Sequence, residues 1–416
     1  MSGLAETIAL LAQGRIDHLA SASVISDGPG RMTETVGLGS NPGGLRMFSY
    51  APAALPEGAP LVVVLHGCGQ SAEAHAASAG WIGAAERYGF SVLAPEQGLS
   101  NNINRCFNWF QPGDARRGHG EAASIAEMIG KAIQLHQADG DQVYVTGLSA
   151  GGAMAAVMLA AYPELFAGGA VIAGVPFGVT RGVRDALQEM RRPPARPTGL
   201  LADLVRGAAP VRRTRPLRLS IWHGDADEMV NIANAQDLVR QWTAVLGLPE
   251  APAKVTRSTR RTRSVWAPLF HGSSVELNIV HAFGHGTPLS IHGEDGLGAV
   301  APFMLEVEIS STNEIARFWG LKPAQQPARA ATAAPAIPQP PLVVVDTAPA
   351  IPQLPLVALD TAPAIPAPPL APAAAPPPAS PPPKPQRGLI GAIGRAVSRW
   401  SGRVGSAIAR RWKSPS

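Results

Sequence analysis

A serine between two glycines is the first residue of this sequence whose setting indicates chemistry. In "VYVTGLSAGGAM", residues 143 to 154, Ser149 is the centre of a Gly-x-Ser-x-Gly pentapeptide that joins a β-branched, aromatic run to a run of small residues. Strand, sharp turn and helix in this order form a nucleophile elbow, which lifts a serine hydroxyl clear of its backbone. Gly147 and Gly151 would allow the strand and the helix to approach closely. The alternative is an unreactive Gly-rich turn, so the interpretation depends on partners elsewhere.

A serine nucleophile needs a histidine base, which a carboxylate orients in turn. With such an elbow the order along the chain is Ser, then Asp or Glu, then His. The histidines downstream of the serine are His223, His271, His281, His285 and His292. His285 follows the last predicted strand in "FGHGTP", where a Gly-flanked loop can bring its imidazole back over Ser149. His281 lies inside the apolar run "NIVHAF", which favours a buried strand residue.

Two aspartates close the predicted strand "LRLSIWHGDADEMV", where the acid is expected. One carboxylate must face the histidine, and the other can be a solvated turn. Asp227 begins the exit toward the next helix, so we interpret it as the acid. Asp225 is then a turn or capping residue.

An oxyanion hole needs two N–H donors, and the residue after the nucleophile, Ala150, supplies the first. The second belongs to a loop after an early strand, which is where "LHGCGQ" stands. We therefore expect the Cys68 N–H as the second donor, with Gly67 and Gly69 permitting the bend. Two such donors stabilise a transition state by roughly a few kcal/mol. The alternative for "HG" after a strand is an ordinary tight turn.

The elements that must position these residues alternate between strand and helix. Six short apolar runs have the pattern of strands buried on both faces, at residues 60–67, 90–97, 142–149, 168–177, 217–227 and 275–286. Helical patterns lie between them, at 71–89, 120–139, 151–166 and 231–247. The alternation predicts an α/β fold, a mainly parallel sheet with helices on both faces and ligands at the carboxyl ends of its strands. Residues 178–216 interrupt it, and we interpret them as an insertion or lid over the site.

Composition changes near residue 321. Residues 321–385 are rich in Pro and Ala and repeat "APAIPQ" at 334 and 348, which predicts an extended, polyproline-like linker. In residues 386–416 apolar side chains recur every three or four positions with arginines opposite them, the pattern of a basic amphipathic helix. We expect this helix to bind an anionic membrane or a hydrophobic particle. The alternative is a basic tail without a partner.

Charge and cysteine content exclude several classes of protein. The net charge is +5, but the last 96 residues hold ten Lys or Arg and two Asp, so the remaining 320 residues carry a small negative charge. We therefore expect no nucleic-acid partner. Two cysteines without paired spacing indicate no metal site. Residues 1–44 predict an amphipathic helix and a lead-in rather than a clear signal peptide, which leaves the compartment open between secreted and cytoplasmic or granule-associated.

Several segments together resemble the PHB depolymerase family of esterases. They include "PLVVVLHGCGQ", "RCFNWFQPGDARRGHGEAASI", "VYVTGLSAGGAMAAVMLAAYPELFAGGAVIAG", "WHGDAD" and "GHGTPL", spread over most of residues 45–320. The resemblance implies an α/β-hydrolase catalytic domain with Ser149 as nucleophile, Asp227 as acid, His285 as base and Cys68 as the second oxyanion donor. It also implies hydrolysis of poly(3-hydroxybutyrate) or its oligomers through an acyl-enzyme, without a cofactor.

The resemblance leaves some assignments open. Feruloyl and acetyl-xylan esterases share much of this pattern, and a granule- or membrane-binding protein with a vestigial elbow is an alternative outside the enzymes. Trp109 and Phe110 in "CFNWF" either line an apolar ester pocket or pack in the core. Cys68 and Cys106 would form a disulfide beside the site in an exported protein and stay reduced in the cytosol.

Overall fold

The computed structural model describes residues 31–211, 213–268 and 272–324. The expected N-terminal helix, the Pro/Ala-rich linker and the basic C-terminal helix lie outside the described residues. Among the helices in these ranges, none combines the length and the apolar character needed to cross a bilayer.

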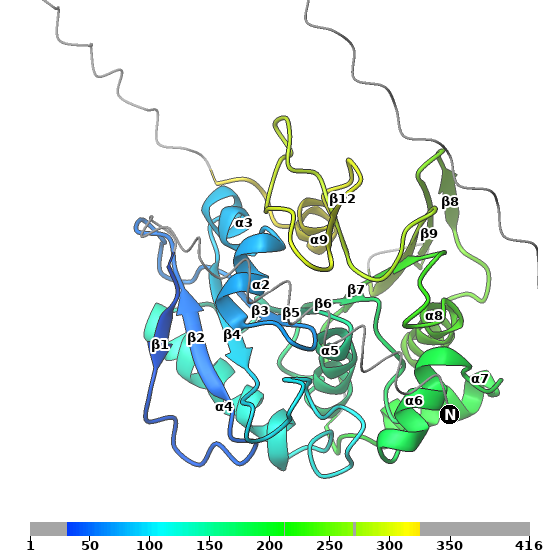
Figure 1. Cartoon of the computed structure of the whole chain (residues 1–416), viewed down its shortest axis with the longest axis horizontal. Coiled ribbons are helices and arrows are strands. Elements are labelled where there is room, and N and C mark those ends of the chain that lie inside the picture. The colour runs from blue at the N-terminus through cyan, green and yellow to red at the C-terminus, as the bar shows by residue number, and fades with distance from the viewer. Residues whose placement is uncertain (1–30, 212, 269–271, 325–416) are drawn as a thin grey trace, which may run out of the picture. The chain divides into compact units, whose positions relative to one another are not determined.

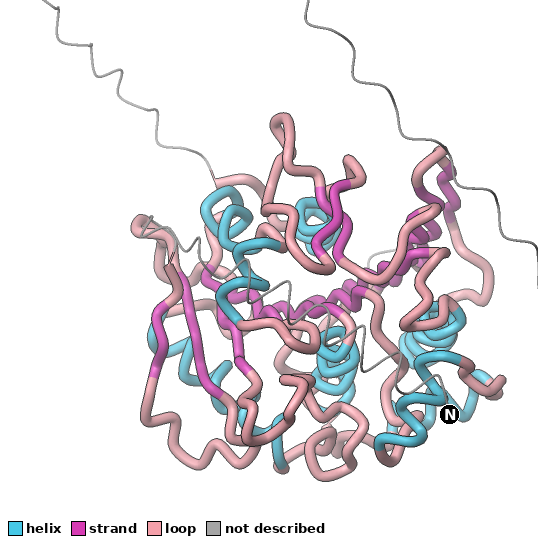
Figure 2. Tube along the Cα trace, in the orientation of Figure 1, coloured by secondary structure: helices cyan, strands magenta, loops and turns pink. Residues whose placement is uncertain are grey.

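A ten-stranded sheet runs through the middle of the described chain (Figure 2). Its six central strands are parallel and, except for parts of β7 and β10, fully buried, as their apolar sequences predict. In spatial order they are β4 (Ser91–Glu96), β3 (Leu61–Leu65), β5 (Val143–Leu148), β6 (Gly168–Ile172), β7 (Arg218–Gly224) and β10 (Ser274–Val280). The predicted α/β fold with a mainly parallel sheet is confirmed.

Antiparallel strands extend the sheet at both edges. β1 (Thr33–Thr35) and β2 (Arg46–Tyr50) lie beside β4, and β9 (Arg261–Trp266) and β8 (Lys254–Arg257) lie beside β10. A separate parallel pair is formed by β11 (Thr287–Leu289) and β12 (Met304–Glu306). The sequence analysis missed the edge strands because they carry charged, partly exposed residues rather than apolar runs. It missed β11 and β12 because each has only three residues.

Helices cover both faces of the sheet (Figure 1). One face carries α4 (Gly120–His136), α5 (Ala150–Ala161) and α8 (Ala233–Leu246); the other carries α2 (Ala72–Ser78), α3 (Trp81–Tyr88) and α9 (Ser311–Trp319). The single helix expected at 71–89 is divided into α2 and α3. Gly80 separates them with φ +85°, a left-handed conformation that a helix cannot continue through.

The elbow glycines explain how α5 reaches its place. A Cβ on Gly151 would lie 2.1 Å from the Leu65 carbonyl oxygen, and one on Gly147 would lie 2.3 Å from the Gly151 carbonyl. Only residues without a side chain allow this contact between α5 and the sheet. The whole of α5 is buried as a result.

The predicted insertion holds two helices, α6 (Val183–Arg191) and α7 (Thr198–Arg206). The buried Glu189 of α6 accepts two hydrogen bonds from Arg196, at 2.8 and 2.6 Å. Asn234 of α8 donates to the Glu189 carbonyl at 2.9 Å, and Gln241 of the same helix donates to Leu201 of α7 at 3.0 Å. Both helices are therefore fixed on α8.

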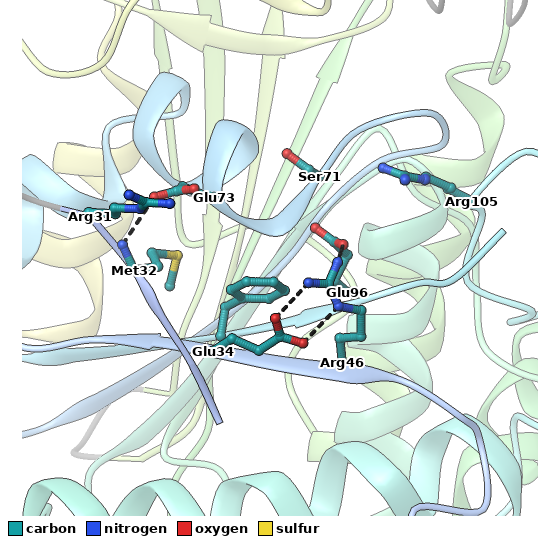
Figure 3. Close-up of a pocket in the computed structure, with 9 residues that line it drawn as sticks. Arg31, Met32, Glu34, Arg46, Ser71, Glu73, Glu96 and Arg105 are labelled. Atoms are coloured by element: carbon teal, nitrogen blue, oxygen red, sulfur yellow. Dashed lines mark hydrogen bonds and ion pairs between the residues drawn. The ribbon is translucent and has the colours of Figure 1, made fainter. Parts of the chain in front are cut away.

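A charged cavity of about 430 Å³ lies at the β1 edge of the sheet (Figure 3). Arg46 donates to Glu34 at 2.8 and 2.6 Å and to Glu96 at 2.8 Å. The other oxygen of Glu96 accepts the Ala72 N–H at the start of α2, at 2.8 Å. Because these charged side chains are hydrogen-bonded to one another and to α2, we assign the network a structural role: it joins the edge strands to α2.

Candidate active site

The nucleophile elbow predicted around Ser149 is present in the backbone. Ser149 lies between the end of β5 and the start of α5 with φ 56° and ψ −117°, a conformation that residues with a Cβ rarely adopt. Its N–H donates to the Ile172 carbonyl at 2.8 Å, and its own carbonyl accepts from Ala153 at 2.9 Å. The contacts on both sides hold the strained residue at the carboxyl edge of the sheet.

Asp227 and His285 form a buried pair at the same edge. Asp227 Oδ2 lies 2.7 Å from His285 Nδ1, and the two side chains are 0% and 6% exposed. The other carboxylate oxygen, Oδ1, accepts the N–H groups of Met229 and Val230 at 2.9 and 2.8 Å. The acid therefore keeps one oxygen on its own loop and aims the other at the imidazole.

The hydrogen bonds keep this buried carboxylate ionised. Burial alone would raise the pKa of Asp227, but His285, the Val230 N–H and His223 together lower it below its ordinary value. His223 stays neutral because burial lowers its pKa, and its Nε2 lies 2.7 Å from the Val230 carbonyl. An ionised Asp227 holds the Nδ1 proton of His285, which leaves Nε2 free to accept a proton.

Ser149 and His285 border one small cavity, together with Gly67, Cys68, Leu148, Met229 and Phe303. The Phe303 ring meets the His285 imidazole edge to face, with ring centres 5.8 Å apart. The structure thus brings together the three residues that the sequence analysis selected, from three different loops.

The other aspartate and the other histidine form a second pair. Asp225 occupies the turn after β7, as predicted, and its Oδ2 lies 2.9 Å from His281 Nδ1. The prediction that His281 is a buried strand residue is wrong. β10 ends at Val280, and the His281 side chain is 34% exposed beyond it. Neither residue borders the cavity at Ser149.

The two amides expected in the oxyanion hole both belong to residues beside Ser149. Within the described part of the chain, the N–H groups of Cys68 and Ala150 make no hydrogen bond. His66 stabilises the loop that carries the Cys68 amide. Burial lowers the pKa of His66 to about 4, so the neutral ring accepts the Gln97 N–H at Nε2, 3.1 Å away, and donates from Nδ1 to the Gly67 carbonyl at 2.8 Å. The sequence analysis did not select His66, although "LHG" contains it.

A larger apolar cavity of about 410 Å³ opens beside Ser149. Trp109 and Phe110 line it, meeting edge to face with ring centres 5.5 Å apart, although Trp109 is also packed into the core and is only 9% exposed. Four residues of α6 also line it: Val183, Ala186, Leu187 and Met190. The insertion that was expected over the site therefore contributes part of the cavity wall through α6.

A disulfide joins Cys68 to Cys106 in the structure, with the sulfurs 2.08 Å apart. Both cysteines line the larger cavity. The bond connects the loop of Cys68 to the loop that carries Trp109 and Phe110.

Glu121 organises the loop of residues 97–110 from the start of α4. Its buried carboxyl group accepts the backbone N–H and the side-chain amide of Asn108, both at 2.7 Å, and the amide of Gln97 at 2.5 Å. Burial raises the pKa of Glu121 to about 8. No sequence pattern distinguished this glutamate from the exposed Glu127 of the same helix.

Among the residues that the structure describes, no group of three or more His, Cys, Asp or Glu side chains is arranged to hold a metal ion.

Comparisons with known proteins agree on ester hydrolysis. The family described as Esterase PHB depolymerase matches residues 46–266. Poly(3-hydroxyalkanoate) depolymerase C of Paucimonas lemoignei is 38% identical over 291 residues, 70% of each chain. Feruloyl esterase B of Neurospora crassa is 33% identical over 216 residues, 50% of this chain and 73% of the relative.

Two fungal acetylxylan esterases are also similar. Acetylxylan esterase A of Aspergillus oryzae is 28% identical over 280 residues, covering 64% of this chain and 87% of the relative. Among solved structures, an acetyl xylan esterase from Aspergillus awamori superimposes with a TM-score of 0.59 at 23% identity, over 70% of this chain and all of the other. At that identity the structural likeness supports the α/β-hydrolase fold alone.

Proposed function

Because the chain belongs to the PHB depolymerase family of esterases and is a carboxylic ester hydrolase, we propose that it cleaves its ester through Ser149, His285 and Asp227. The observation that carries this proposal is the buried 2.7 Å contact between Asp227 and His285, whose imidazole borders the same cavity as Ser149.

The first half-reaction acylates the serine. His285 Nε2 takes the proton of Ser149 as the hydroxyl oxygen attacks the ester carbonyl carbon, and Asp227 stabilises the imidazolium that forms. The N–H groups of Cys68 and Ala150 donate to the carbonyl oxygen as it becomes negative. The intermediate then collapses, and His285 returns the proton to the departing alcohol oxygen.

The second half-reaction regenerates the enzyme. His285 removes a proton from a water molecule, whose oxygen attacks the acyl carbon through the same oxyanion donors. The bond to Ser149 Oγ breaks, the serine regains its proton and the carboxylic acid leaves. No step requires a cofactor.

We propose short-chain polyhydroxyalkanoate, or its oligomers, as the substrate. The cavity walls are mostly apolar. Of the asparagines that line it, Asn102 is occupied within its own loop, because its Oδ1 accepts the N–H groups of Asn104 and Cys106 and its Nδ2 donates to Asn108. Asn101 Nδ2 donates to the Gly43 carbonyl, Gln97 and Glu121, which leaves the Asn104 side chain as the main polar group open to a ligand. A sugar would need more free polar groups than this, whereas an aliphatic acyl chain does not. The 38% identical relative is named as a poly(3-hydroxyalkanoate) depolymerase.

Two measurements test these proposals. Ser149→Ala should abolish hydrolysis of p-nitrophenyl butyrate while the circular dichroism spectrum stays unchanged, and retained hydrolysis would exclude the serine mechanism. Product analysis with 3-hydroxybutyrate oligomers, amorphous granules and feruloylated or acetylated sugars then decides the substrate. Release of ferulate or acetate faster than of 3-hydroxybutyrate would refute the polyester assignment and favour the functions named for the fungal relatives.

For residues 386–416 we propose binding to an anionic membrane or a polymer granule, on the basis of their basic amphipathic pattern. Deleting them should leave hydrolysis of p-nitrophenyl butyrate unchanged and weaken sedimentation with granules or with vesicles containing phosphatidylglycerol. Equal sedimentation of the full and shortened chains would refute the proposal.

A further inference from the structure

Two aspartate–histidine pairs connect the same two loops, which follow the neighbouring parallel strands β7 and β10. The inner pair, Asp227 and His285, is the buried one described above. The outer pair, Asp225 and His281, has a 2.9 Å contact and side chains that are 38% and 34% exposed. Each member of the outer pair is the first residue after its strand. Along both loops the outer pair therefore lies nearer to the strand end than the inner pair does.

Asp225 uses both of its carboxylate oxygens on the loop after β10. Oδ2 faces His281 Nδ1, and Oδ1 accepts the Ala282 N–H at 2.7 Å. Ala282 has φ +51°, in the left-handed region that residues with a Cβ rarely adopt. The Asp225 carboxylate is thus bonded to the strained residue and to the one before it.

His281 extends these contacts to a third element. Its Nε2 lies 3.1 Å from Thr262 Oγ1 on β9, and its backbone N–H donates to the Arg260 carbonyl at 2.8 Å. A threonine hydroxyl can donate or accept, so this contact suits either protonation form of the ring. The imidazole consequently joins the exits of β7 and β10 to the β8–β9 hairpin.

The contact between the two loops continues from the outer pair to the inner one. The Ala226 N–H donates to the Phe283 carbonyl at 3.0 Å, and Phe283 is buried. A Cβ on Gly224 would lie 2.0 Å from that same carbonyl oxygen, so the two backbones touch. Two residues further along, His285 meets its aspartate. A displacement at His281 is therefore passed along the loop through Phe283, two residues before the base.

We propose that the outer pair, Asp225 and His281, is a positioning pair for the reaction: it fixes the strained exit of β10 so that His285 keeps its alignment with Asp227 and Ser149. The inference rests on the triad proposed above. Because neither member borders the cavities at Ser149, the pair acts on the rate of the chemical step and leaves substrate binding unchanged.

The test compares variants of the full chain. His281→Ala should lower kcat on p-nitrophenyl butyrate by roughly 10- to 100-fold, because a misplacement of about 1 Å in a catalytic group costs up to that factor. KM should stay within about twofold. His281→Asn, whose amide can still donate to Asp225, should recover most of the rate. Thr262→Val removes only the outer contact of the ring and should cost a few-fold. The exposed His292 supplies the matched control, His292→Ala.

A spectroscopic measurement separates positioning from general stability. The Nδ1 proton shared by His285 and Asp227 should give a downfield proton resonance in the parent, and this signal should shift or broaden in His281→Ala but stay unchanged in His292→Ala. A normal kcat in His281→Ala, or a loss of kcat with an unchanged resonance, would overturn the proposal. So would a rise in KM that accounts for the lost efficiency. If Ser149→Ala retained activity, the proposed function itself would fail instead.

Discussion

Replacing Asp227 with asparagine tests the proposed mechanism most directly. The carboxylate has two distinct oxygens: Oδ1 accepts two backbone N–H groups, from Met229 and Val230, and Oδ2 faces His285 Nδ1. An asparagine can satisfy the backbone donors only with its carbonyl oxygen. Its NH₂ group must then point at Nδ1, which forces the His285 proton onto Nε2.

The wrong tautomer removes the base. With Nε2 protonated, His285 cannot accept the Ser149 proton, and the same substitution in a serine protease lowers kcat roughly 10⁴-fold. We expect a similar loss in Asp227→Asn, equivalent to about 5.4 kcal/mol of transition-state stabilisation. Exchanging two hydrogen bonds to a charged group for bonds to an amide should cost about 1–3 kcal/mol in the free energy of unfolding.

The assay measures kcat and KM on p-nitrophenyl butyrate, with circular dichroism and urea unfolding to establish that the variant is folded. Asp295→Asn is the matched control, because Asp295 is 55% exposed and paired with Arg317 at the surface. A folded Asp227→Asn enzyme within tenfold of the parent kcat would refute the role of Asp227 in holding the His285 tautomer.

Three further outcomes are expected. Gly151→Ala should destabilise the protein or prevent folding, because the new Cβ would lie 2.1 Å from a backbone carbonyl oxygen. Gly130 of α4 has open space around it, so Gly130→Ala should raise the free energy of unfolding by about 0.5–1 kcal/mol. Chemical denaturation of both variants measures the contrast. Replacing Cys68 and Cys106 by serine should lower that free energy by about 2–4 kcal/mol, and a double variant as stable as the oxidised parent would contradict this. Burial lowers the pKa of His75 from 6.5 to about 3, so between these pH values the unfolded chain binds a proton that the folded protein does not. The free energy of unfolding therefore falls as the pH drops from about 6.5 toward 3. His75→Leu should reduce the acid-induced loss of stability by up to about 1.4 kcal/mol per pH unit, as measured by urea unfolding at pH 7 and pH 4.5.

The sequence predicted the central sheet well because the relevant forces there are local. Short apolar runs identify strands buried on both faces. The glycines around Ser149 mark the turn at which α5 lies close against the sheet, as a nucleophile elbow requires. Strand ends were predicted less well. β6 and β10 stop earlier than expected, where Ala173 and Ala282 take positive φ values. Alanine avoids that region, so no local sequence preference predicts it. Tertiary hydrogen bonds hold it instead: the Ala173 N–H donates to the Trp222 carbonyl of β7, and the Ala282 N–H donates to the Asp225 carboxylate.

The sequence by itself determined which residue types could do the chemistry and the order in which they follow one another. It also favoured Asp227 and His285 as the partners of Ser149, and the tertiary structure places these two in contact. Only the tertiary structure revealed the second pair, Asp225 with His281, away from Ser149. It also decided that α6 forms a wall of the cavity and that Glu121 holds the loop of Trp109. The physical reason is the same in each case. Side chains nearly 60 residues apart meet because parallel strands bring their exits to one edge, and the choice between neighbouring partners depends on burial and backbone strain that no local pattern encodes.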